Sequence, residues 1–294
     1  MKDKLSTESY KGVRDFYPED QQFLNYLIET YGGVATRFGY VEYHASILEP
    51  SELYKAKGAD NEELVSEQTY TFTDRGGREV TLRPEMTPTV ARMVAARRRD
   101  LGFPLRLFSI PNVFRYERPQ RGRLREHWQL NVDIFGSDSL SCEAEIIEVA
   151  HEIMKSFGAE ESDFTIKLGS RAFVNALCIE LELSEEATAQ LVGLLDRKNK
   201  ISVEEFEAGL AELGVPKEKL SGDVVPQDVA AVLNILQAQG ITNAVFDPSI
   251  VRGFAYYTGV VFEVFDTHKD NNRALFGGGR YDNLTALFDN ESIT

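Results

Sequence analysis

Five arginines and no lysine lie in FRYERPQRGRLREHWQ, residues 114–129. They are Arg115, Arg118, Arg121, Arg123 and Arg125. The guanidinium group is a planar fork that matches phosphate and carboxylate groups and keeps its charge wherever it lies. The segment therefore predicts a clamp for anions, although a charged hairpin tip would also explain it. The neighbouring carboxylates of Glu117 and Asp133 indicate that an amine-bearing group could bind there too.

The acidity of the whole chain narrows the choice of anion. The 294 residues carry a formal net charge of −15, whereas nucleic-acid-binding surfaces normally belong to basic domains. A local cluster of arginines in an acidic chain favours a small, focused anion site over non-specific contact with nucleic acid or anionic lipid.

Two further segments carry polar side chains suited to a small ligand. TLRPEMTPTV places Glu85 and Thr87 two residues apart at the end of an expected strand, although Glu85 could simply pair with Arg83 or another nearby arginine. RGFAYYTG holds Arg252, Tyr256 and Tyr257, and tyrosine pairs are also common on sheet surfaces. These residues alone do not decide between a binding site and a structural role.

The glycine run in FGGGRYD matches neither the P-loop spacing nor GxGxxG. We interpret Gly277, Gly278 and Gly279 as a place of close backbone approach, on a strand that lines a pocket.

Metal and nucleophile chemistry find little support. The histidines are His44, His127, His151 and His268, and none has the spacing of a ligand pair. Cys142 and Cys178 are far apart and belong to no CxxC motif, and no GxSxG occurs. We expect no resident metal and no permanently bound cofactor.

Bulk properties describe an ordinary globular protein. Hydrophobic residues make up 43% and charged residues 27% of the chain. No apolar run approaches the roughly 20 residues that cross a bilayer, and the first residues lack the apolar core of a signal peptide. We expect a cytoplasmic protein without membrane contact.

The elements that position these residues follow from hydrophobic periodicity. Residues 21–40 predict a helix whose apolar face is formed by Phe23, Leu27, Tyr31, Val34 and Phe38, with Gly39 ending it. Residues 70–84 predict a hairpin, and two strands should flank the arginine segment. Residues 141–158 predict a second helix, and the composition from about residue 170 to 240 predicts helices. Strand character then returns, so strands from both sides of the helical region should share a sheet.

These segments and their order resemble the histidyl-tRNA synthetase family of class II aminoacyl-tRNA synthetases. The resemblance rests on KGVRDFYPED, GYVEYHASILEPSELY, YTFTDRGGREVTLRPEMTPTVARM, FRYERPQRGRLREHWQLNVDIFG, VRGFAYYTGVVFEVF and FGGGRYDNL. The arginine segment is similar to the family's motif 2, and RGFAYYTG is similar to a signature of the histidine-specific enzymes.

The resemblance implies an α+β class II fold, with a mostly antiparallel sheet of six to seven strands flanked by helices. It also implies three segments: a core at 1–168, a helical insertion at 169–238 and a return to the core at 239–294. The implied partners are histidine, ATP with Mg²⁺ as substrate, tRNA(His) and a second copy of the chain in a homodimer. The implied reaction is ATP-dependent formation of histidyl-adenylate, followed by transfer of the histidyl group to tRNA.

Site roles follow from the same resemblance. Arg115 should bind the ATP α-phosphate and the attacking carboxylate, and Arg252 should act at the α-phosphate, where other class II enzymes place a metal ion. Glu117 should face the adenine amino group, Arg123 the outer phosphates, and His127 the adenine ring. The implied histidine pocket consists of Glu85, Thr87, Gln129, Asp133, Tyr256 and Tyr257.

The chain departs from the family pattern at several positions. Ser46 replaces a motif 1 proline, His127 replaces a phenylalanine that stacks on adenine, and Ala255 replaces an acidic residue. The sequence also ends before the family's motif 3 and its anticodon-binding domain. We therefore expect the chain to be part of a longer protein, with weak ATP binding or no activity by itself.

Two other functions share this fold. One is a non-catalytic, histidine-sensing regulatory subunit of ATP phosphoribosyltransferase, and the other is a synthetase-like interaction module. Arg252, the tyrosine pair and the motif 2 arginines favour the synthetase, because a histidine sensor has no need of them.

Overall fold

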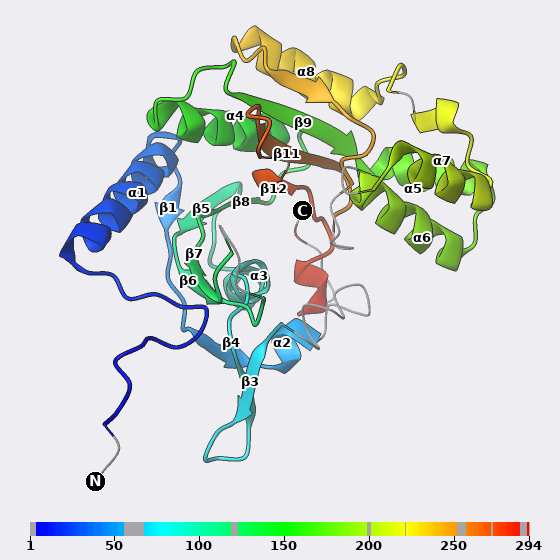
Figure 1. Cartoon of the computed structure of the whole chain (residues 1–294). Coiled ribbons are helices and arrows are strands. Elements are labelled where there is room, and N and C mark those ends of the chain that lie inside the picture. Colours follow the sequence, from blue (N-terminus) through cyan, green and yellow to red (C-terminus); the bar gives the residue numbers. More distant parts are fainter. Residues whose placement is uncertain are drawn as a thin grey trace. The chain divides into compact units, whose positions relative to one another are not determined.

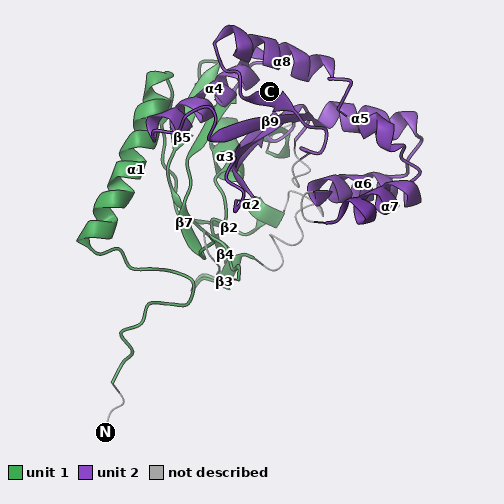
Figure 2. Cartoon of the chain, turned by 45° about the horizontal axis from the view of Figure 1, so that its top comes forward, with its two compact units in different colours: residues 1–134, 285–291 green, residues 135–284, 292–294 purple. Residues whose placement is uncertain are grey.

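The computed structural model describes residues 4–55, 68–118, 123–198, 201–220, 222–251, 257–271, 273–288 and 293. The chain divides into two compact units, shown in Figure 2. Unit 1 comprises residues 1–134 and 285–291, and unit 2 comprises residues 135–284 and 292–294.

Unit 1 contains short strands and three helices among its described residues. In chain order they are α1 (Pro18–Arg37), β1 (Val41–Glu42), β2 (Leu48–Pro50), α2 (Glu52–Lys55), β3 (Tyr70–Thr73), β4 (Glu79–Leu82), α3 (Thr87–Arg97), β5 (Leu105–Ser109), β6 (Asn112–Phe114), β7 (Glu126–Trp128) and β8 (Asn131–Phe135), with the 3-10 turn η5 at Thr285–Leu287. The strands form sheets in the orders β1-β5-β8, β2-β4-β3 and β6-β7.

Helix α1 is confirmed, although it begins and ends three residues earlier than predicted and buries Leu24 in place of Phe23. Its C-cap is Phe38, and Gly39 follows at φ +82°, which confirms the glycine stop. Phe23 was predicted to be buried, and this is wrong because 63% of its side chain is exposed. The adjacent Leu24 is buried instead. The rest of the predicted face is confirmed, because Val34 is fully buried and Leu27, Tyr31 and Phe38 are partly buried.

The hairpin predicted for residues 70–84 is confirmed. Strands β3 and β4 pair antiparallel, with Phe72 opposite Val80. In the turn, the Asp74 carboxylate accepts hydrogen bonds from the backbone N–H groups of Gly76 and Arg78, at 2.8 and 2.9 Å. These bonds lower the pKa of Asp74.

Proline interrupts the two long strands expected around the arginine segment. The first is divided into β5 and β6 at Pro111, which has no N–H for a sheet ladder. Opposite it, Gln129 donates its backbone N–H to the Pro111 carbonyl, at 3.0 Å, between β7 and β8. This is one reason why the described strands form four separate sheets instead of the single sheet that was expected.

Unit 2 is built on a four-stranded sheet in the order β10-β9-β11-β12. Its elements are α4 (Ser141–Ser156), β9 (Phe164–Ser170), α5 (Arg171–Glu180), α6 (Glu185–Asp196), α7 (Val203–Glu212), the 3-10 turn η4 (Lys217–Leu220), α8 (Gln227–Ala238), β10 (Ala244–Phe246), β11 (Val260–Asp266) and β12 (Ala274–Gly279). Strand β9 precedes the helical region, and β10 to β12 follow it, so strands from both sides share one sheet as predicted.

Two cores stabilise unit 2. In the first, α4 and α8 pack against the sheet, with Ile147, Leu168 and Val232 fully buried. The second joins α5, α6 and α7 through residues such as Leu177, Leu191 and Leu210. Figure 1 shows these three helices as a group beside the sheet, apart from α4 and α8. The expected class, a mostly antiparallel α+β fold with flanking helices, is confirmed, with β1–β5 and β9–β10 as parallel pairs.

Candidate functional site

The β6–β7 hairpin carries most of the predicted ATP-binding residues. Phe114 pairs with Glu126, and the backbone N–H of Arg115 donates to the Arg125 carbonyl at 2.9 Å. The ladder therefore continues past the strand ends toward the tip. Arg121 lies outside the described residues, and Arg118 is exposed near the tip.

Glu117 and Arg123, predicted to hold opposite ends of ATP, form an ion pair with each other. The Glu117 carboxylate is 7% exposed, whereas half of the Arg123 side chain reaches solvent. A buried carboxylate without a positive partner would carry a large desolvation cost. The pair therefore satisfies Glu117 within the hairpin itself, and a ligand that binds either residue must compete with the other.

Arg125 has a structural role that the sequence did not reveal. It is 7% exposed, and its Nε donates to the Glu117 carbonyl at 3.1 Å. Its Nη1 donates to the Tyr10 hydroxyl at 3.2 Å and to the Lys11 carbonyl at 3.1 Å. The guanidinium also lies 3.9 Å from the centre of the Tyr116 ring. The expectation that all five arginines form one anion clamp is therefore wrong for Arg125, because its donors bind the protein itself.

Arg115 and His127 lie on opposite arms of the hairpin: Arg115 directly follows β6, and His127 is in the middle of β7. The Arg115 Nε donates to the Pro84 carbonyl at 2.9 Å, which fixes the plane of its guanidinium. Burial lowers the pKa of His127, and the nearby positive charges of Arg115 and Arg123 act in the same direction. Together they bring this pKa to about 4. The imidazole is thus neutral at pH 7 and offers a flat, uncharged ring beside two arginines.

The predicted amino-acid side of the site comes from α3 and β8. Glu85 is 5% exposed and directly precedes Met86, the N-cap of α3, while Thr87 is the first residue of that helix. Asp133 is 7% exposed in the middle of β8. The side-chain oxygen Oε1 of Gln129 is buried without a hydrogen-bond partner among the described residues. A buried amide oxygen of this kind favours a ligand donor or a water as its partner.

Arg83 does not act as the simple ion-pair partner that the sequence allowed for Glu85. Its three guanidinium nitrogens donate to the carbonyls of Ala45 and Ser46 and to the backbone and side-chain oxygens of Asn112. This buried arginine, directly after β4, joins the segment between β1 and β2 to β6. Ser46, a departure from the family pattern, thus contributes its carbonyl to the arrangement.

In unit 2 the predicted residues are only partly described. Arg252, Ala255 and Tyr256 lie outside the described residues. Tyr257 is 7% exposed, and its ring centre lies 6.3 Å from that of Tyr281.

The predicted close approach at the glycine run is confirmed for Gly279. A Cβ there would lie 2.6 Å from the Val261 side chain and 2.9 Å from the Tyr257 ring. Only glycine fits this position without displacing its neighbours.

Arg280, which follows the glycine run, ties this region together. Its Nε and Nη2 bind the two carboxylate oxygens of Glu143 at 2.5 and 2.8 Å, and Nη1 binds Asp282 at 3.3 Å. The Arg280 carbonyl accepts from the Thr258 backbone N–H at 2.8 Å, and the Thr258 hydroxyl donates to Asp282 at 2.7 Å. Sequence reasoning missed this network because Glu143 is 137 positions away.

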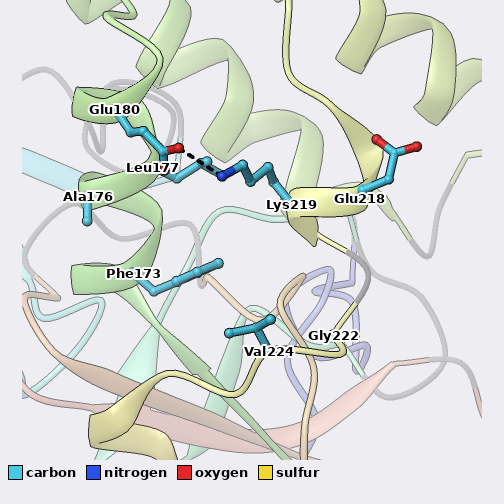
Figure 3. A pocket seen from close by; sticks show the side chains of 8 residues that line it. All are labelled: Phe173, Ala176, Leu177, Glu180, Glu218, Lys219, Gly222 and Val224. Carbon is cyan, nitrogen blue, oxygen red and sulfur yellow. Dashed lines mark hydrogen bonds and ion pairs between the residues drawn. The ribbon is translucent and has the colours of Figure 1, made fainter.

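A cavity of about 310 Å³ lies elsewhere in unit 2, between α5, η4 and the chain that follows (Figure 3). Its lining residues are Phe173, Ala176, Leu177, Glu180, Glu218, Lys219, Gly222 and Val224. Lys219 and Glu180 form an ion pair at its edge, at 2.8 Å. None of the predicted site residues lines this cavity.

The described residues contain no group of three metal-ligating side chains that could hold an ion. Nor does any helix within them have the length and apolar character needed to span a bilayer.

Comparison with known proteins gives a consistent result. Residues 12–293 match the family model described as histidyl-tRNA synthetase. The chain is 45% identical to the histidine–tRNA ligase of Leptospira biflexa, over 99% of this chain and 71% of that protein. It is 38% identical to the ligase of Thermoplasma volcanium, over 98% and 71%.

Solved structures agree at the level of the fold. The histidyl-tRNA synthetase of Nostoc matches with a TM-score of 0.83 at 20% identity, over 99% of this chain and 72% of that one. A Bacillus halodurans protein, titled both ATP phosphoribosyltransferase regulatory subunit and histidyl-tRNA synthetase, matches with a TM-score of 0.78 at 25% identity, over 100% and 80%.

Proposed function

Because the chain belongs to the histidyl-tRNA synthetase family, we propose that it catalyses histidine activation as a histidine–tRNA ligase. The carboxylate of histidine attacks the α-phosphorus of ATP, pyrophosphate leaves, and the histidyl group then passes to tRNA(His). The observation that carries this proposal is 45% identity to a histidine–tRNA ligase over 99% of the chain. A regulatory subunit of ATP phosphoribosyltransferase is not favoured, because curated relatives at this identity are named as ligases.

Adenylation brings two anions together, so the residues must stabilise negative charge more than they must form bonds. Arg115 would bind the α-phosphate and the attacking carboxylate, with its plane already fixed on the Pro84 carbonyl. Arg252 would bind the same phosphate. Mg²⁺ would arrive on the outer phosphates of ATP as part of the substrate.

ATP binding would exchange partners within the Glu117–Arg123 ion pair. The adenine amino group would take the place of Arg123 on Glu117, and the outer phosphates would take the place of Glu117 on Arg123. The neutral imidazole of His127 would stack on the adenine ring, because it brings no charge to repel the two arginines. This exchange allows one short hairpin to hold both ends of the nucleotide.

The histidine pocket would combine acceptors with a polar rim. Glu85 and Asp133 are acceptor-only carboxylates, one suited to the substrate ammonium and the other to an imidazole N–H. Gln129 offers its buried amide oxygen, and Thr87, Tyr256 and Tyr257 complete the proposed pocket. A site built from hydrogen-bonding groups rejects apolar amino acids of similar size far better than an apolar pocket does.

The wider arrangement remains part of the proposal. Residues 169–238 would form a helical insertion between core segments 1–168 and 239–294, supported by the run from α5 to α8 between paired strands β9 and β10. We also propose a homodimer and a cytoplasmic location. Another relative, at 33% identity, is named as chloroplastic and mitochondrial, so membership of the family does not fix the compartment.

Histidine-dependent exchange of pyrophosphate into ATP tests the proposed function. The protein should catalyse exchange with histidine and not with phenylalanine, and Arg115→Gln should lower the rate by roughly 100-fold or more. Arg97→Gln is the matched control, because Arg97 ends α3 and is 71% exposed. Absence of exchange, with histidine binding retained, would favour the regulatory subunit instead.

A further inference from the structure

Tyr43 and Ser109 lie side by side on neighbouring strands of unit 1. Strand β1 pairs parallel to β5, with Glu42 opposite Phe108. The Tyr43 backbone N–H then donates to the Phe108 carbonyl at 2.9 Å, which extends the pairing by one residue. In this register Tyr43 is the neighbour of Ser109, and paired residues direct their side chains to the same face.

Both hydroxyl groups are buried, and neither has a hydrogen bond of normal distance and angle among the described residues, although the Ser109 hydroxyl lies close enough to Tyr43 to lower its pKa. Ser109 as a whole is only 2% exposed. A buried hydroxyl without a partner costs about 1–3 kcal/mol, whereas phenylalanine and alanine would fill the same space without that cost. Two adjacent unsatisfied hydroxyls in one strand pair therefore indicate that another state of the protein supplies their partner.

An acidic group on the strand beyond β5 is the candidate partner. The sheet order β1-β5-β8 places β5, which carries Ser109, between β1 and β8, and Asp133 lies on β8. Burial raises the pKa of Tyr43, and the negative charge of Asp133 raises it further, while the Ser109 hydroxyl and Arg83 act in the opposite direction. The Asp133 carboxylate is thus close enough to interact with the Tyr43 hydroxyl through space.

We infer that Tyr43 is a positioning residue of the histidine pocket, whose hydroxyl donates a hydrogen bond to the Asp133 carboxylate when histidine is bound. Ser109 lies beside this pair and orients the tyrosine hydroxyl. The inference rests on the proposed function, in which Asp133 accepts an imidazole N–H. With one carboxylate oxygen engaged by Tyr43, the other is held in a single direction toward the substrate, and the carboxylate stays ionised as an acceptor.

The test is removal of the tyrosine hydroxyl alone, by Tyr43→Phe. A hydrogen bond to a charged group predicts a rise of about tenfold in the KM for histidine. The kcat and the KM for ATP should change less than twofold. The acidic limb of the kcat/KM profile for histidine should move to higher pH, because Asp133 loses a donor that favours its charged form. Ser109→Ala should show the same pattern at smaller size.

Thermal unfolding separates this role from a structural one. Without histidine, Tyr43→Phe should melt at the same temperature as the parent protein or higher, because an unsatisfied hydroxyl has been removed. Tyr31→Phe is the matched control, since Tyr31 lies on α1, where burial also raises its pKa. It should leave the KM for histidine unchanged.

Three results would overturn the inference. An unchanged histidine KM in Tyr43→Phe would show that the hydroxyl does not act in the pocket. A parallel rise in both KM values, with a lower melting temperature, would assign Tyr43 a structural role. If the parent protein did not bind histidine in calorimetry, the proposed function itself would fail, and this inference with it.

Discussion

Replacing Glu143 with glutamine should destabilise unit 2 through loss of its ion pair with Arg280. The two side chains meet through two hydrogen bonds, at 2.5 and 2.8 Å, and are only 7% and 14% exposed. Glutamine keeps the shape of the side chain but loses its charge, and one of its two positions now presents N–H groups to the guanidinium. The variant thus isolates the electrostatic contribution from packing.

The size of the effect follows from burial. Breaking a buried pair and leaving one charge uncompensated costs about 3–5 kcal/mol. Arg280 retains its bonds to Asp282 and to the carbonyls of Ser137 and Ser139, so we expect the lower end, about 3 kcal/mol. For a folding unit of this size, that corresponds to a fall of roughly 6–12 °C in Tm.

Urea unfolding monitored by circular dichroism measures this cost, with Glu180→Gln as the matched control in the same unit. The Glu180–Lys219 pair has a similar distance, 2.8 Å, but its side chains are 58% and 46% exposed. Exposed pairs contribute about 0–1 kcal/mol. A Glu143→Gln cost no larger than that of the control would refute the idea that burial makes the Arg280 network important.

The same variant should also affect activity. The Arg280 carbonyl and Asp282 hold Thr258, which directly follows Tyr257 of the proposed pocket. We expect the KM for histidine to rise in Glu143→Gln, while the KM for ATP changes less. Glu180→Gln should leave both constants unchanged.

Three further changes test other parts of the structure. Arg125→Lys should speed limited proteolysis ahead of α1 severalfold, because one ammonium cannot replace the fork that binds the N-terminal segment. Gly279→Ala should lower stability by about 1–3 kcal/mol, since its Cβ would lie 2.6 Å from the Val261 side chain. His127→Phe should reduce the loss of stability on acidification. The folded pKa of His127, about 4, lies below its unfolded value, so protonation favours the unfolded chain as pH falls from about 6.5 toward 4, by on the order of 1 kcal/mol at pH 5.

Each of these changes has a control on the same chain. Arg118→Lys, at an exposed position of the hairpin, should leave proteolysis unchanged. Gly33→Ala, in α1 with open space around it, should be neutral or stabilising. His44→Phe, at an exposed position, is the control for His127→Phe, and the melting temperatures of both variants are compared at pH 7 and pH 5. Equal responses of a variant and its control would contradict the corresponding prediction.

Local features were predictable because their causes lie within a few residues. The glycine stop after α1 and the turn between β3 and β4 depend on adjacent backbone and side-chain groups. The break at Pro111 was also readable, since proline removes a sheet donor, and it was missed only because the apolar pattern continues across it. By contrast, the burial of Leu24 in place of Phe23 at the start of α1 was not predictable, because the surface that the helix packs against comes from elsewhere in the chain.

By itself, the sequence determined the family, the order of the elements and the residue types of the proposed site, because ordered motifs along one chain carry that information. Only the tertiary structure decided which charged groups face each other. Arg125 binds Tyr10, 115 positions away, and Arg280 binds Glu143, 137 positions away. The sequence alone does not distinguish an arginine that binds a ligand from an arginine that stabilises the fold. They differ only in which acceptors the folded backbone brings within about 3 Å.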